Sequence, residues 1–180
     1  MDGIPTLIST NTAASITNLY ITSGLDGTYD EYMFVMTDFH PETDNNALTF
    51  QVSTNGGTSY STSNVSTHFA YRHSEDNSVA ALAYVAGDDE TSTGAIYLGA
   101  GGLGGAADES LSGILHIFSP ANTTFVKHWY ARTNEYYVSN YSIDTYVAGY
   151  FNTTSAVDAI FWQMAAGGDM SGVVQLYGIS

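Results

Sequence analysis

The side chains that could support chemistry are the histidines and the clustered acids. A metal-binding pair needs two histidines that reach one point, for example four residues apart on a helix. No two of the five histidines have that spacing, and no Gly-x-Ser-x-Gly nucleophile motif occurs. We therefore expect structural or surface histidines, no metal site, no catalytic residues and no enzyme activity. The five are His40, His68, His73, His116 and His128.

Four groups of acids offer only oxygen ligands, the donor set that Ca²⁺ prefers. None follows the twelve-residue calcium-loop pattern, so solvated acidic loops without a cofactor are the favoured interpretation, and Ca²⁺ is the ion they would suit. Paired carboxylates could also cleave glycosides, but sequence alone does not place two at the needed separation. The groups are 26–31, 38–44, 75–76 and 88–90.

The glycine-rich segment 99–104 has the letter spacing of a dinucleotide-binding loop, with Gly99, Gly101 and Gly104. That loop works by placing a pyrophosphate on the N-terminus of a following helix. Here the segment 108–110 leads instead into a strand-like run. We therefore predict a simple glycine loop.

The charge balance excludes several classes of partner. The 180 residues include 18 acids but only three lysines and arginines, giving a net charge of -15. Nucleic acid and anionic lipid would repel such a chain, so we predict neither a nucleic-acid nor a membrane partner. No stretch has the length of a membrane span, and no signal peptide is recognisable. The absence of cysteine excludes disulfides and thiolate metal sites.

Apolar residues recur at every second position along most of the chain, which is the period of a strand. Leu48, Phe50 and Val52 alternate with polar residues, and a turn at 55–58 follows. The segment 78–86 fits a short helix as well as a strand. About ten short strands predict one all-β domain over residues 1–180, a two-sheet antiparallel sandwich of jelly-roll-like connectivity. The other strands are expected near 15–22, 32–39, 66–73, 94–98, 114–118, 124–132, 135–138, 145–151, 159–164 and 173–179.

Three of these strands are apolar on both sides, which predicts a central or interface position. In the segment 32–39, Tyr32, Phe34 and Met36 would face one way. Met33, Val35 and Phe39 would face the other. The segments 114–118 and 159–164 have the same character and supply apolar surface for self-association.

Aromatic residues are the candidate binding residues, because tyrosine and tryptophan serve both sugar platforms and protein interfaces. Sheet core is the alternative for most of them. The residues singled out as interface or glycan-platform candidates are Trp129, Tyr130, Tyr136, Tyr137, Phe161 and Trp162.

Several segments resemble small structural proteins of tailed bacteriophages. They are Tyr29–Phe34, Pro41 with Asn46–Gln51, Ser53–Tyr60 and the run Ser171–Ile179. The resemblance covers the first third and the last tenth of the chain and rests on strands and a glycine turn. It implies a β-sandwich of the virion without catalytic residues.

Two positions in a virion fit that resemblance. A decoration or cement protein sits on the head exterior, commonly as a trimer, bound to the major capsid protein. A tail-fibre or receptor-binding protein usually begins with a docking segment, whereas strand-like sequence starts almost at once here. We therefore expect a trimeric decoration protein on the head exterior. A tail-fibre, receptor-binding or carbohydrate-binding module is the alternative.

Overall fold

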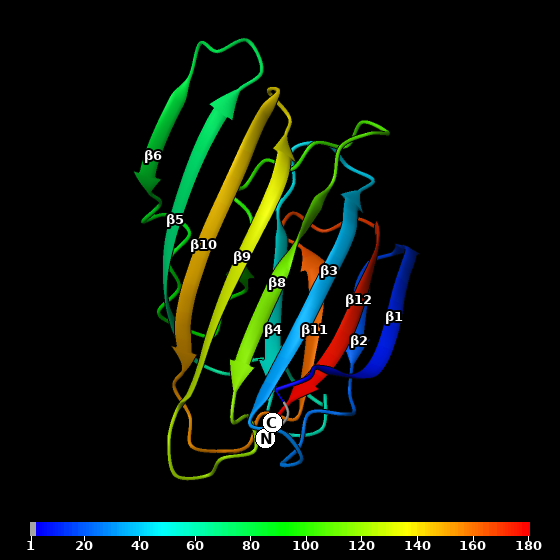
Figure 1. Ribbon diagram of the computed structural model, residues 1–180, viewed down its shortest axis with the longest axis vertical. Helices are drawn as coiled ribbons and strands as arrows, with labels where there is room; N and C mark the ends of the chain where they lie inside the picture. Colours follow the sequence, from blue (N-terminus) through cyan, green and yellow to red (C-terminus); the bar gives the residue numbers. More distant parts are fainter. Residues whose placement is uncertain (1–2) are drawn as a thin grey trace.

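Two antiparallel sheets of unequal size pack face to face in the computed structural model, which describes residues 3–180 (Figure 1). The all-β two-sheet sandwich expected from the sequence is confirmed. The large sheet has the spatial order β1 (Thr6–Ile16), β12 (Met170–Ile179), β3 (Glu31–Pro41), β8 (Leu111–Phe118), β9 (Lys127–Tyr137), β10 (Tyr141–Phe151), β5 (Asn64–Ser74) and β6 (Ala80–Tyr84). The small sheet has the order β2 (Asn18–Ile21), β11 (Ala159–Met164), β4 (Leu48–Ser53) and β7 (Ile96–Tyr97).

The connectivity is that of a jelly roll with one sheet extended. Each strand of the small sheet, β2, β4, β7 and β11, lies in the chain between two strands of the large sheet, so the chain crosses between the sheets before and after each of them. As a result, the four strands β1-β12-β3-β8 face the four strands β2-β11-β4-β7. Strands β9, β10, β5 and β6 continue the large sheet beyond this double layer, as Figure 1 shows.

The hydrophobic core fills the space between the two sheets. Alternation along each strand sends every second side chain into it, so Phe50 on β4 and Trp162 on β11 are fully buried. The Trp162 ring lies 5.4 Å from the Phe34 ring, edge to face, and Trp129 meets Phe50 in the same way at 5.2 Å. Edge-to-face pairs of this kind add to the stabilisation from burial. The two tryptophans therefore belong to the core.

A β-bulge in β3 corrects the predicted facing of Phe39. Tyr32, Phe34 and Met36 point inward as expected. Asp38 has a φ of 52°, and the register with β8 shifts between Met36 and Phe39. The extra residue turns Phe39 onto the inner face, where it is fully buried, rather than onto the face shared by Met33 and Val35.

Three further elements differ from the sequence-based expectation. β1 begins at Thr6, well before the strand expected at 15–22, and the chain bends at Thr17 into β2. The two strands expected at 124–132 and 135–138 form the single strand β9. The segment 78–86, for which a helix was the alternative, contains the strand β6.

The inner side of the sheet extension is covered by the long segment 85–105, which is irregular except for the two-residue strand β7 at the edge of the small sheet. Backbone bonds fasten this segment to β5, with Asn64 N–H donating to Ser92 and Ser66 N–H to Glu90, at 2.8 and 2.9 Å. Polar side chains join the apolar ones between these layers, and His68, Thr145 and Glu135 are all buried. The acidic and glycine-rich parts of the sequence thus close the polar end of the interior.

Candidate functional site

The outer face of the large sheet is the largest continuous surface formed by strands, and strand register places its side chains in rows. One row runs from Gln175 on β12 through Val35, Ile114 and Arg132 to Tyr146 on β10, and then reaches Phe69 and Tyr84 at the β6 edge. A second row joins Tyr177, Met33, His116 and Tyr130. Residues directly opposite on neighbouring strands share one face, so these rows form a single surface.

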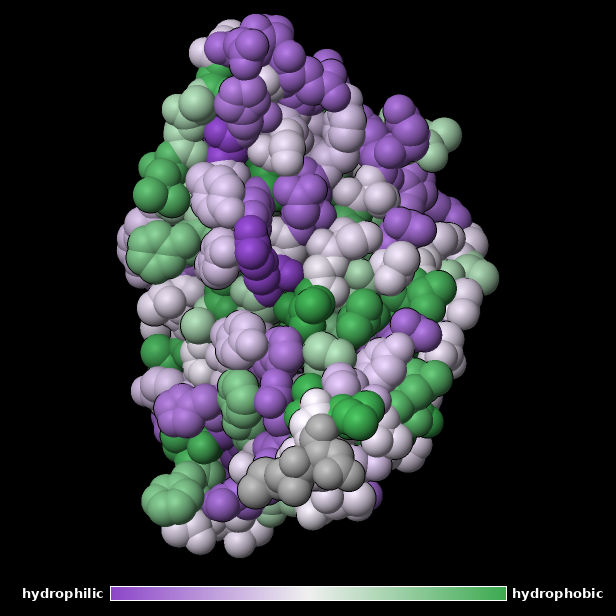
Figure 2. Space-filling model, viewed as in Figure 1, coloured by the Kyte–Doolittle hydropathy of each residue, from purple (hydrophilic) through white to green (hydrophobic). Residues whose placement is uncertain are grey.

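Exposed hydrophobic side chains concentrate on this face. Within residues 3–180, eight of the eleven exposed large hydrophobic residues lie on it. Figure 2, in the same view, shows hydrophobic residues spread over the face between weakly polar ones, with strongly hydrophilic residues gathered at the upper end and a smaller group near the middle. The eight are Leu7, Phe69, Tyr71, Leu82, Tyr84, Ile114, Tyr130 and Tyr146. A patch of this extent is typical of an interaction surface.

Most of the acids lie in loops and not on the strands that form this face. In the part of the chain that the structure describes, only Glu31, Asp38, Glu135 and Asp144 lie in strands, and the remaining acids lie in loops. Glu135 points inward and is buried. Glu31 hydrogen-bonds to His116, and Asp144 forms an ion pair with Arg132. Most of the net charge therefore lies on the loops, and the face itself is nearly neutral.

The charged residues at the centre of the face form one connected cluster. Arg132 donates from Nε and Nη2 to the two oxygens of Asp144, at 3.1 and 2.7 Å, and lies 4.8 Å above the ring centre of Tyr146. Tyr71 donates its hydroxyl to the same carboxylate. Burial alone would raise the pKa of Asp144, but the hydrogen bonds from Arg132 and Tyr71 lower it below its ordinary value. The cluster holds the rings of Tyr71 and Tyr146 in place, stacked at 6.2 Å.

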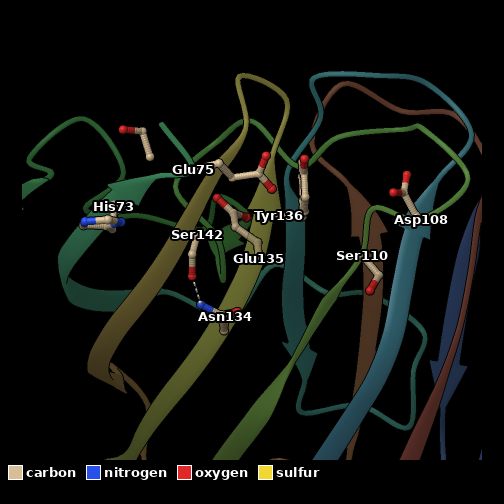
Figure 3. Close-up of a pocket in the computed structure, with 9 residues that line it drawn as sticks. His73, Glu75, Asp108, Ser110, Asn134, Glu135, Tyr136 and Ser142 are labelled. Atoms are coloured by element: carbon tan, nitrogen blue, oxygen red, sulfur yellow. Dashed lines mark hydrogen bonds between the residues drawn. The ribbon is translucent and has the colours of Figure 1, made fainter. Parts of the chain in front are cut away.

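A shallow groove of about 370 Å³ crosses the upper end of the face (Figure 3). His73 comes from β5, Asn134 and Tyr136 from β9, and Ser142 from β10, and the Asn134 amide donates to Ser142 at 3.0 Å. The remaining lining residues include Glu75, Asp108 and Ser110 from the flanking loops. A second hollow of about 460 Å³ shares His73 and Ser142 and continues past Tyr71 and Asp144 toward β6. The two hollows together offer aromatic walls and many hydrogen-bonding groups.

The structure separates the six aromatic candidates into three groups. Trp129 and Trp162 are buried in the core, so the prediction that they form an exposed platform or interface is wrong for the folded chain. Phe161 lies on the outer side of the small sheet but is only 7% exposed, since Tyr60 and Tyr20 pack on it at 4.6 and 5.3 Å.

The other three candidates remain accessible. Tyr130 is on the outer face, 43% exposed and stacked on the His116 ring at 4.6 Å. Tyr136 lines the groove and is half-buried. Tyr137 lies on β9 next to it, also half-buried, and packs against Tyr141 at 5.8 Å. The structure therefore brings Tyr130 and Tyr136 to one face and leaves the other four outside it.

Sequence reasoning missed the aromatic residues of β5, β6 and β10. Phe69, Tyr71, Tyr84 and Tyr146 stand at outward positions of their strands. Alternation predicts which side chains face outward once one inward residue of each strand is known. The inward residues of β5, β9 and β10 were hard to recognise in the sequence, because polar residues such as His68 and Thr145 are among them.

The acid clusters serve mainly to fix loops. Asp76 accepts from the backbone and side chain of the 74–78 turn, and hydrogen bonds from Ser78 and Ser74 lower its pKa to about 2. Asp26 accepts from Thr28 N–H at 2.8 Å and from the Tyr32 hydroxyl at 2.8 Å. Over residues 3–180, no group of three or more histidines and acids has the geometry to hold a metal ion.

The comparisons with known proteins add no relative. No family model matches the chain, and neither does any curated protein. The described part of the chain has no helix long and apolar enough to cross a membrane.

Proposed function

We propose that this chain is a non-catalytic structural protein of a bacteriophage particle, a decoration protein that binds the major capsid protein on the head exterior. The observation that carries the proposal is the outer face of the large sheet, which gathers most of the exposed large hydrophobic residues and few charges. The resemblance of several sequence segments to virion proteins is the reason for proposing a bacteriophage particle as its location.

The dimensions of the face support a protein partner. Eight strands about 4.8 Å apart, on average about ten residues long at about 3.3 Å per residue, span roughly 1,200 Å². A standard protein interface buries about 800 Å² on each side. The acidic loops around the face would stay in solvent, where like charge opposes aggregation of particles.

The placement is tested by labelling and by reconstitution. Antibody against the recombinant chain is expected to label the heads of particles of the phage that encodes it. On particles that lack the chain, added protein should cosediment with the heads. The variant Ile114→Ser/Tyr130→Ser/Tyr146→Ser should bind at least tenfold more weakly, because all three side chains lie on the face.

The matched control is Ile4→Ser/Phe125→Ser, which removes two exposed apolar side chains outside the large-sheet strands and should bind like the wild type. Labelling of tails, absence from particles, or equal binding by the face variant and the control would contradict the proposal.

A second candidate function, binding of neutral oligosaccharides, is favoured by the groove and the aromatic residues beside it. Tyrosine rings stack on sugar rings, and a few polar groups then fix the orientation of the ligand. Tyr71 and Tyr136 supply rings, and Asn134 and Ser142 supply hydrogen-bonding groups. The platform differs from the one expected from the sequence, since Trp129 lies in the core.

On an array of bacterial surface oligosaccharides, this function predicts retention of at least one neutral glycan. Tyr71→Ala is expected to weaken that binding at least tenfold in a titration. Tyr20→Ala, an exposed tyrosine on the small sheet, serves as the control and should bind as the wild type does. An array without bound glycan, or equal losses in both variants, would argue against it.

A further inference from the structure

The strand β6 forms a free edge of the large sheet. It pairs with β5 on one side, and among residues 3–180 no strand pairs with its other side. All five of its residues, Ala80 to Tyr84, are exposed, and Leu82 is 74% exposed.

The hydrogen-bond pattern shows which backbone groups of β6 lack a strand partner. At its two ends, Ser74 N–H donates to Val79 O and Val85 N–H donates to His68 O, both at 2.9 Å. An antiparallel ladder bonds every second residue to one neighbour, so Ala81 and Ala83 bond to β5. The N–H and C=O groups of Ala80, Leu82 and Tyr84 therefore point away from the sheet.

The exposed edge of β6 has none of the usual protection against pairing. Its sequence, Ala-Ala-Leu-Ala-Tyr, contains no charge and no proline, and its register with β5 is regular. Natural proteins protect edge strands with charges, prolines or bulges. The opposite edge has such protection, since β1 shows register irregularities between Leu7 and Ser9 and between Ala13 and Ile16. β6 is the edge prepared for a partner strand.

A second copy of this chain is the partner that the strand itself fits. Antiparallel pairing about a two-fold axis at Leu82 would place Leu82 against Leu82 and Ala80 against Tyr84. These three side chains share the outer face with Phe69 and Tyr71, so pairing would join the two aromatic faces into one surface. Pairing of β6 with β1 of another copy would meet the irregular edge of β1, which opposes it.

We propose that two copies of this chain associate through antiparallel pairing of their β6 strands, which makes one continuous sheet of sixteen strands from two of eight. This contact gives a dimer as the unit of assembly, in place of the trimer expected from the sequence. It does not depend on where the protein sits in a virion.

Sedimentation of the full chain tests the pairing. At micromolar concentration we expect a species of twice the 19.2 kDa chain mass. Leu82→Pro removes an outward N–H without removing a bond to β5, so it should raise the dissociation constant at least a hundredfold. Leu82→Thr, which keeps the N–H and suits a strand, should remain dimeric.

Salt provides a second expected result. Acids flank both ends of the strand, with Asp76 before it and Asp88 and Asp89 after it. Two-fold pairing brings the end of one strand near the beginning of the other, so these acids repel, and added NaCl should tighten the dimer.

Amide hydrogen exchange of the wild-type chain gives a readout that does not rely on a variant. The amides of Ala80, Leu82 and Tyr84 should become protected as the protein concentration rises, while those of Ala81 and Ala83 are protected at all concentrations. A monomer or a trimer in solution, an unaffected dimer in Leu82→Pro, or unprotected Leu82 at high concentration would overturn the proposal.

Discussion

Trp162→Ala is expected to destabilise the folded chain by about 3–5 kcal/mol, the range for removing a large aromatic side chain from a core. Trp162 has no exposed surface, and its ring packs edge to face on Phe34. The free energy of unfolding of a folded domain is about 5–15 kcal/mol, so this loss would be a large fraction of the total stability. The midpoint temperature of thermal unfolding should decrease by about 10 °C.

Two further variants make the test specific. Trp162→Phe should lose much less stability, because phenylalanine keeps an aromatic ring at this position. The indole Nε1 has no hydrogen-bond partner, so its removal leaves no other group unpaired. Phe125→Ala removes an aromatic residue that is 69% exposed, and it should change stability by about 0.5 kcal/mol or less. Urea denaturation measures all three. Unchanged stability in Trp162→Ala together with weaker self-association would place Trp162 at an interface instead of in the core.

The same residue shows how far the sequence could carry the fold. A period of two identified most strands and the two-sheet sandwich, because β4 and β11 send apolar residues inward at every second position. It could not separate core from interface within 159–164, since this strand is apolar on both faces. Only the three-dimensional structure shows that Tyr20 and Tyr60 cover Phe161 while Trp162 lies between the sheets.

The binding surface was harder to predict than the fold. Its rows combine residues from seven strands spread over most of the sequence, and strand register determines which of these residues become neighbours. A single positive φ at Asp38 was enough to move Phe39 from the outer to the inner face. Strand β1 escaped detection because an edge strand buries little, and its side chains are mostly Ser, Thr and Asn.

The second prediction with a large effect concerns the pH dependence of stability, which we attribute to ionisable residues buried beneath the sheet extension. Glu135 is buried, and its Oε1 accepts from Ala100 N–H at 3.0 Å while Oε2 has no partner. Burial raises the pKa of Glu135 from 4.5 to about 7. The folded state therefore holds a proton that the unfolded chain releases above pH 4.5, and stability falls as the pH rises from there to about 7. The loss amounts to about 3 kcal/mol.

His68 acts in the opposite direction. It is buried under the same segment, and neither ring nitrogen has a hydrogen-bond partner. Burial lowers its pKa from 6.5 to about 4, an effect that Asp89 partly offsets. Below pH 6.5, His68 binds a proton in the unfolded chain but stays neutral in the folded chain. Stability therefore falls as the pH drops from 6.5 toward 4. Over the shared range the two residues oppose each other, and they should give a flat stability profile.

Glu135→Gln is expected to remove the contribution of Glu135 and leave only that of His68 in the pH dependence of stability. The amide keeps an oxygen to accept from Ala100 but cannot ionise, so the alkaline loss disappears. Relative to the wild type, the change in unfolding free energy between pH 4.5 and pH 8 should become more favourable by about 3 kcal/mol. Taking the difference between two pH values removes any constant effect of burying the amide.

The measurement is urea denaturation of both proteins at pH 4.5, 6 and 8, with His68→Gln as the mirror variant. His68→Gln should lose the acid-side decline and keep the alkaline one. Parallel curves for wild type and Glu135→Gln would mean that the carboxylate is already ionised in the folded chain, compensated by groups other than Ala100. The segment 85–105 would then be held by charge, whereas the geometry argues that a neutral acid and a neutral imidazole let it pack against β5 and β9.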